Sequence, residues 1–215
     1  MAWPCSIATW TSTGWRDTRS SGSSTPPASP LPDPAIQGPA AAAPPQYASA
    51  PMAHDGRRYE LVEGVLLVSP APTPRHQRCV AALTALLYAA ETDGSVVLPA
   101  PCEWVVDPGT VFQPDVLVVR RQDLHETAVR GTPLLVVEVL SQSTRLTDLG
   151  AKRVAFESAG VPAYWVVDPE VPTLTVLRLE RGQLVEAARV IGNEPYQATF
   201  PFRVTVVPAD LLRGV

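Results

Sequence analysis

Two Val-rich runs constrain the architecture that this chain can adopt. DVLVV (115–119) and LLVVEVL (134–140) are almost unbroken apolar segments of strand length. Such runs are typical of strands buried on both faces, because a strand with one solvated face alternates apolar and polar residues. A third run, AYWVVD (163–168), has the same character. The chain therefore has to place a central sheet between two covering layers.

Helical periodicity supplies candidates for those layers. Apolar residues recur at helical spacing from Arg75 to about Glu91, and a second helix is predicted from about Thr147 to Ala159. Further strands are predicted at 59–62, 65–69, 96–98, 103–106, 173–180 and 183–190. This order of elements predicts an α/β or α+β fold with one central sheet and helices on its faces.

The first 50 residues differ in composition from the rest. They hold nine of the 24 prolines and only four charged residues, and most of the stretch is Pro/Ser/Ala-rich. Such a segment buries too little apolar surface to offset its chain entropy. We predict a disordered leader over 1–50 and one folded domain over 51–215. The leader is either a regulatory tail or the product of an upstream start codon, and the sequence favours neither.

Composition excludes several classes of protein. The chain has 17 basic and 21 acidic residues, a net charge of −4, so it does not coat nucleic acid through bulk charge. No apolar run reaches the roughly 20 residues of a membrane-spanning helix, and the N-terminus lacks the pattern of a secretory signal. Its three cysteines are scattered, which predicts neither a disulfide framework nor a zinc site. We expect a soluble, cytoplasmic protein.

Two carboxylates interrupt the apolar runs. Glu138 is the one polar residue within LLVVEVL, and Asp115 opens the neighbouring run. Burying even a neutral polar group without a partner costs roughly 2–7 kcal/mol, and two nearby acids also repel each other. A Mg²⁺ ion between them would relieve both costs, since it binds one or two carboxylates and retains waters. The alternatives are pairing with an arginine, or a strand face that is exposed after all.

Lys152 is the only lysine among 17 basic residues. In so Arg-rich a chain, a single lysine suggests a position that needs a compact ammonium group. It lies on the predicted helix that follows the Glu138 strand, from which its side chain could turn back toward that strand. The alternatives are a surface i,i+4 pair with Asp148, worth a few tenths of a kcal/mol, or chance.

The chain resembles a known family over about residues 57–190. The segments that carry the resemblance are QPDVLVV (113–119), LLVVEVLSQSTRLTDLGAKRVAFESAGVPAYWVVDP (134–169) and YELVEGVLLVSPAPTPRHQR (59–78). They are similar to the bacterial Uma-two family of putative restriction endonucleases, within the PD-(D/E)xK nuclease superfamily. The block from Glu138 to Asp168 is the most specific part. The resemblance implies a restriction-endonuclease-like fold with a central mixed sheet flanked by helices.

The resemblance also implies roles for single residues. Asp115 corresponds to the PD aspartate and Glu138 to the (D/E) residue, both of them metal ligands. Leu140 stands two residues after Glu138, so the ExK tripeptide is missing. The family carries this lysine on the following helix instead, where Lys152 lies. Glu60, in YELVEG, matches a family acid near the first strand and is a further candidate metal ligand.

The implied function is a Mg²⁺-dependent, or Mn²⁺-dependent, endonuclease that hydrolyses DNA phosphodiester bonds. Lys152 would orient the attacking water or stabilise the extra negative charge. Arg75, His76 and Arg78, at the start of the first helix, are candidate DNA contacts, although a surface histidine is the simpler interpretation of His76.

Two other functions compete with this one. The first is a non-catalytic DNA- or partner-binding module on the same fold, which the net charge of −4 favours. The presence of Asp115, Glu138 and Lys152 together opposes it. The second and more distant one is a metal-binding regulatory protein. A homodimer is compatible with cutting two strands, but the sequence specifies no interface.

Overall fold

The computed structural model describes residues 10–11, 14–15 and 56–214. Within the predicted leader, only Trp10–Thr11 (β1) and Gly14–Trp15 (β2) are described, and they pair antiparallel in a unit separate from the domain. The prediction of disorder for the other leader residues falls outside the described residues. In the described part of the chain, no helix combines the length and apolar character needed to cross a bilayer.

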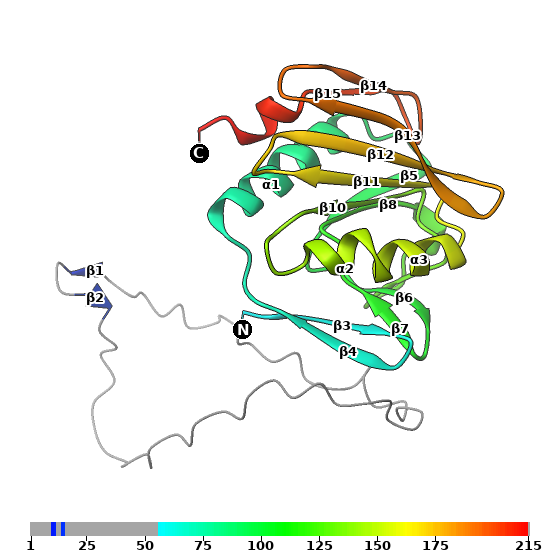
Figure 1. Ribbon diagram of the computed structural model, residues 1–215. Helices are drawn as coiled ribbons and strands as arrows, with labels where there is room; N and C mark the ends of the chain where they lie inside the picture. The colour runs from blue at the N-terminus through cyan, green and yellow to red at the C-terminus, as the bar shows by residue number, and fades with distance from the viewer. Residues whose placement is uncertain (1–9, 12–13, 16–55, 215) are drawn as a thin grey trace, which may run out of the picture. The chain divides into compact units, whose positions relative to one another are not determined.

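A six-stranded mixed sheet forms the centre of the domain, in the order β13-β12-β11-β10-β8-β5 (Figure 1). Its strands are β5 (Ser95–Pro99), β8 (Val116–Arg120), β10 (Leu135–Val139), β11 (Ala163–Asp168), β12 (Thr173–Glu180) and β13 (Gln183–Ile191). β10 and β11 run parallel, whereas the other neighbours are antiparallel. The three Val-rich runs lie side by side as β11, β10 and β8, and every residue of β10 is buried. The predicted central sheet is confirmed.

Each face of this sheet carries its own hydrophobic core. On one face, α1 (Pro74–Ala89) packs with β14 (Tyr196–Ala198), β15 (Val204–Val206) and the 3-10 helix η3 (Pro208–Leu212). On the other face lie residues of β6 (Trp104–Asp107), β7 (Thr110–Phe112) and the second helical region. The rings of Trp104, Phe112 and Phe156 contact one another there, and Phe156 also contacts Tyr164 of β11. Because side chains alternate along a strand, Glu138 shares this second face with Val136.

A smaller five-stranded sheet has the order β4-β3-β7-β6-β9. It consists of β3 (Arg58–Val62), β4 (Val65–Ser69), β6 (Trp104–Asp107), β7 (Thr110–Phe112) and β9 (Val129–Arg130). The turn between β3 and β4 has positive φ at Glu63 (50°) and Gly64 (80°), as in a type I′ hairpin. Leu61 pairs with Val111, so β7 anchors this hairpin near the main sheet. Sequence periodicity missed β7, because three residues are too few to display a period.

The second predicted helix is interrupted. It begins two residues earlier than predicted, as α2 (Arg145–Leu149), breaks at Gly150 and resumes as α3 (Ala151–Ser158). A Cβ atom at Gly150 would lie 2.8 Å from the carbonyl oxygen of Leu146, so only glycine fits at this break.

Candidate active site

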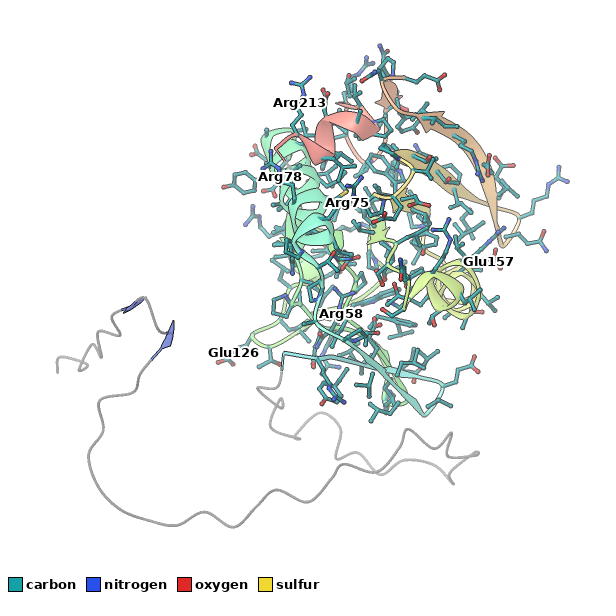
Figure 2. All side chains as sticks on the ribbon, turned by 60° about the vertical axis from the view of Figure 1, so that its left-hand side comes forward. Arg58, Arg75, Arg78, Glu126, Glu157 and Arg213 are labelled. Atoms are coloured by element: carbon teal, nitrogen blue, oxygen red, sulfur yellow. The ribbon has the colours of Figure 1, made fainter. Side chains whose placement is uncertain are left out.

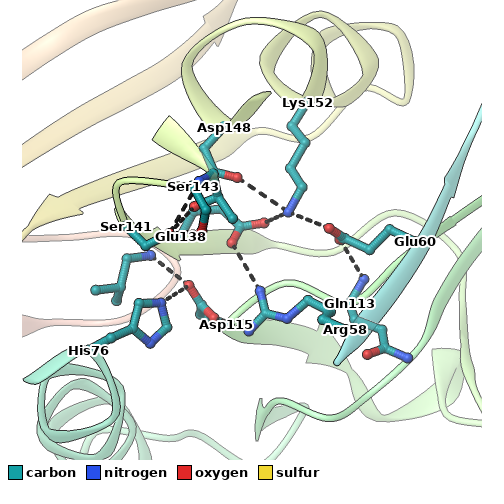
Figure 3. Close-up of polar contacts among 12 residues, drawn as sticks. Arg58, Glu60, His76, Gln113, Asp115, Glu138, Ser141, Ser143, Asp148 and Lys152 are labelled. Atoms are coloured by element: carbon teal, nitrogen blue, oxygen red, sulfur yellow. Dashed lines mark hydrogen bonds and ion pairs between the residues drawn. The ribbon is translucent and has the colours of Figure 1, made fainter. Parts of the chain in front are cut away.

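The two acids of the apolar runs lie on neighbouring strands. Asp115 directly precedes β8, and Glu138 is the fourth residue of β10. These strands pair with Val116 opposite Val137, so the two carboxylates meet at the same end of the strand pair. Both are about 1% exposed. Figure 3 shows their side chains in one cluster with residues from β3, α1, α2 and α3.

Lys152 lies at the centre of one side of this cluster. Its Nζ is 2.8 Å from Glu60 Oε2, 2.9 Å from Glu138 Oε1 and 3.3 Å from Asp148 Oδ1 (Figure 3). The side chain is 2% exposed. Burial alone would lower its pKa, but the charges of Glu138, Glu60 and Asp148 outweigh burial and raise the pKa of Lys152 above its usual range. The pair with Asp148 exists, but it is buried and not a surface pair.

Asp115 is surrounded by hydrogen-bond donors. Its Oδ2 accepts a 2.7 Å hydrogen bond from the backbone N–H of Val139 and lies 3.2 Å from Nε2 of His76, while Oδ1 is bound by Arg58. Burial opposes ionisation, yet the hydrogen bond from His76, the charge of Arg58 and the Val139 N–H together lower the pKa of Asp115 below its ordinary range. Asp115 is therefore a carboxylate in this site.

Glu138 and Asp148 behave in the opposite way. Burial raises the pKa of Glu138 well above its ordinary value, and Asp148, Asp115 and Glu60 add to this effect against the charge of Lys152. Burial also raises the pKa of Asp148. These two acids share one ammonium group, so their ionised forms are stabilised less than that of Asp115.

Glu60, on β3, uses both of its carboxylate oxygens within the protein. Oε1 accepts a 2.9 Å hydrogen bond from the backbone N–H of Gln113, and Oε2 binds Lys152. Across residues 56–214, no group of three or more His, Cys, Asp or Glu side chains is arranged to hold a metal ion. The metal-ligand role of Glu60 stays a prediction, while its observed contacts are with the lysine and the backbone.

His76 is not the surface residue that the simpler interpretation expected. It lies in the first turn of α1, where Thr73 caps the helix, and its side chain is only 7% exposed. The reason is its hydrogen bond to Asp115, which draws the ring into the protein. Its Nδ1 is buried without a hydrogen-bond partner among the residues that the structure describes.

The other two candidate DNA contacts of α1 do not join His76. Arg75 donates to the carbonyl oxygen of Pro169 at 2.8 and 3.0 Å. Arg78 donates to the carbonyl oxygen of Arg213, in the C-terminal segment (Figure 2). The structure therefore gives these three side chains different partners, and a DNA-binding role for them stays a prediction.

Arg58, at the start of β3, is the component that sequence reasoning missed. Its guanidinium binds Asp115, and Nη1 lies 3.9 Å from Glu138 Oε2 (Figure 3). The pairing of a buried acid with an arginine was one of the alternatives considered from the sequence. Nothing in the sequence distinguishes Arg58 from the other arginines, because its role depends on how β3 packs against the main sheet.

A pocket of about 320 Å³ opens beside these residues. Arg58 and His76 contribute to its wall, together with segments 69–73 and 140–144 and with Pro169 and Glu170. Serine and threonine side chains line part of this pocket, whereas Asp115 and Glu138 are not among its lining residues.

The cluster holds more acidic than basic side chains. Four acids, Glu60, Asp115, Glu138 and Asp148, face two permanently charged bases, Arg58 and Lys152. The acidic groups of the cluster thus outnumber these bases by two. Carboxylate oxygens such as those of Asp115 and Glu138 are the ligand type that a hard divalent cation prefers, but in the structure the guanidinium of Arg58 lies against them.

Known proteins resemble this chain in family and in fold. A search of curated proteins finds no match. Among solved structures, the crystal structure of a putative nuclease belonging to DUF820 from Anabaena variabilis matches with a TM-score of 0.59 and 16% identity. The match covers 77% of this chain and 94% of that one, so the two proteins share a fold. The Uma2 family, described as "putative restriction endonuclease", matches residues 44–206. This chain belongs to the Uma2 family.

Proposed function

We propose that this protein is a Mg²⁺-dependent endonuclease that hydrolyses DNA phosphodiester bonds, with Mn²⁺ as an alternative metal. The observation that carries the proposal is the convergence of Asp115, Glu138 and Lys152 from three separate elements into one buried, acid-rich cluster beside a pocket. The description of the family supports a nuclease, and the structurally similar DUF820 protein is itself described as a putative nuclease.

Asp115 and Glu138 would hold the metal. A bound divalent ion supplies a Lewis acid for a phosphate oxygen and lowers the pKa of a coordinated water. The Val139 N–H and His76 fix the orientation of Asp115, so one ligand is set in place before binding. Glu138, with its raised pKa, would lose a proton as the metal binds, which makes metal affinity dependent on pH.

Lys152 would act as a fixed ammonium group. Its raised pKa keeps it protonated at neutral pH, so it donates hydrogen bonds and does not serve as a general base. Glu60 and Asp148 hold the amine beside Glu138. From this position the ammonium can orient an attacking water or stabilise the negative charge that develops on the phosphate.

DNA is the proposed substrate, which would place the activity in the cytoplasm. Serine and threonine hydroxyls along the pocket and the basic residues at its wall are suited to a phosphodiester backbone. Cleavage of both strands of a duplex takes two such sites, which a homodimer would provide.

A plasmid-nicking assay with Mg²⁺ or Mn²⁺ tests this function. We expect the wild type to nick DNA, and Asp115→Ala, Glu138→Ala and Lys152→Ala each to reduce the rate by about a hundredfold or more. Arg213→Ala, in the exposed C-terminal segment, serves as the control that should cleave normally. The absence of cleavage of single-stranded, duplex and branched DNA with either metal would overturn the proposal.

One observation favours a second function, that of a non-catalytic DNA- or partner-binding module. Arg58 already compensates part of the charge of Asp115 and Glu138, as in a site that has no need of a metal. Binding of labelled DNA by wild-type protein, without cleavage under any metal condition and with unchanged affinity in EDTA, would support this second function instead.

A further inference from the structure

Arg58 stands where the two proposed metal ligands face each other. It is the first residue of β3, and its guanidinium binds Oδ1 of Asp115 while reaching within 3.9 Å of Oε2 of Glu138. Its side chain is 17% exposed and forms part of the pocket wall, whereas the two acids are 1% exposed. Of these three side chains, Arg58 is therefore the one that a cation in the pocket would meet.

A guanidinium and a divalent ion compete for the same oxygens. Each takes carboxylate oxygens as its preferred partners, and two cations a few ångströms apart repel each other strongly where water is largely excluded. Asp115 Oδ2 is already engaged by the Val139 N–H and by His76, so Oδ1 is the oxygen left for a further cation. Arg58 occupies that oxygen.

We propose that Arg58 is the resident counter-ion of Asp115 and Glu138, and that a divalent ion binds only by displacing it. This inference rests on the metal dependence of the proposed function. Arg58 keeps the acids compatible with burial in the metal-free protein, at the cost of a weaker metal site. The displaced guanidinium stays at the pocket, beside the hydroxyls of Ser141 and Thr144, where a phosphate oxygen of the substrate would enter.

Metal affinity of charge-changing variants tests this proposal. Mn²⁺ is titrated calorimetrically into wild type, Arg58→Gln, Arg58→Lys and Arg213→Gln at pH 8, with far-UV circular dichroism as a check of folding. We expect Arg58→Gln to bind Mn²⁺ about tenfold more tightly or better, because the competing charge is gone. Arg58→Lys keeps the charge, and Arg213 lies in an exposed pair with Asp210, so both should stay within about threefold of the wild type.

Three results would overturn the role proposed for Arg58. Equal or weaker Mn²⁺ binding by Arg58→Gln overturns the inference, and so does the absence of binding by both this variant and the wild type. If Arg58→Gln does not fold, the Nε–H resonance of Arg58 in the wild type, assigned by its loss in Arg58→Lys, replaces the titration. That resonance should shift on Mg²⁺ addition in the wild type and not in Asp115→Asn, and an unmoved resonance contradicts displacement.

The same experiment distinguishes this inference from the proposed function. Tighter binding by Arg58→Gln together with no DNA cleavage by the wild type leaves Arg58 as the counter-ion and refutes the nuclease. Cleavage by the wild type with unchanged metal affinity in Arg58→Gln leaves the nuclease in place and refutes the role of Arg58.

Discussion

The two ends of the acid cluster solve the same electrostatic problem in different ways. Asp115 and Glu138 are equally buried, at about 1% exposed, on neighbouring strands. Asp115 accepts a hydrogen bond from a backbone N–H and contacts His76 and Arg58 closely, whereas Glu138 shares one ammonium group with Glu60 and Asp148 and lies 3.9 Å from the same arginine. The pKa of the first is lowered and that of the second raised. The number of donors around each carboxylate, and not its depth, decides its ionisation.

Of the three substitutions considered, removal of the shared ammonium group of Lys152 should lower the free energy of unfolding most. Lys152→Met leaves three buried acids facing one another, and we expect a loss of about 3–5 kcal/mol of unfolding free energy in EDTA at pH 7. Urea denaturation measures it. Arg189→Met is the control, since its pair with Glu186 is about half exposed and should change stability by less than about 0.5 kcal/mol. A Lys152→Met variant as stable as this control would contradict the central position of the lysine.

A smaller loss of unfolding free energy is expected at Asp115, the carboxylate with more hydrogen-bond donors. Asp115→Asn weakens charge-assisted hydrogen bonds from Val139 N–H, His76 and Arg58, and should cost about 2–3 kcal/mol in EDTA at pH 7. Because the folded-state pKa of Asp115 is lowered, its contribution is present above the ordinary pKa of an aspartate and is lost as pH falls through the folded value. The cost of Asp115→Asn should therefore persist from pH 6 to pH 9 and shrink only in acid. A cost that vanishes at pH 6 would be inconsistent with this assignment.

Substitution of Glu138 should change the free energy of unfolding least, and in the stabilising direction. Its folded-state pKa is raised, so the carboxyl contributes full stability below its unfolded pKa and loses it as pH rises through the folded value. Glu138→Gln removes this loss and should be neutral or more stable than the wild type by about 1 kcal/mol in EDTA at pH 8. The two proteins should converge near pH 4. Melting curves at both pH values measure the difference in stability. A markedly lower melting temperature of Glu138→Gln at pH 8 would refute the claim that burial and the neighbouring acids destabilise the ionised form of Glu138.

The sequence alone predicted the parts of the site that break a local pattern. Asp115 and Glu138 stand out because they interrupt apolar runs, and Lys152 because it is the only lysine. The three central strands of the sheet could be predicted in a similar way, because an unbroken Val-rich run is typical of a strand that is buried on both faces.

The remaining components depend on tertiary contacts that leave no local signal. Arg58 is one arginine among 16, and only the pairing of β3 with β7 brings it to the acids. His76 resembles any histidine at a helix start until Asp115 is placed beside it. The i,i+4 spacing predicts the pair of Asp148 with Lys152, but the burial of this pair within the cluster depends on the tertiary structure.

Metal-linked melting of the wild type and Glu138→Gln tests most directly the claim that this cluster holds a divalent ion. A ligand at a hundred times its Kd stabilises the folded state by about 2.7 kcal/mol. We predict that saturating Mg²⁺ raises the melting temperature of the wild type by several degrees relative to EDTA, and that of Glu138→Gln much less. A wild-type melting temperature that is the same in EDTA and in saturating Mg²⁺ or Mn²⁺ would contradict the claim.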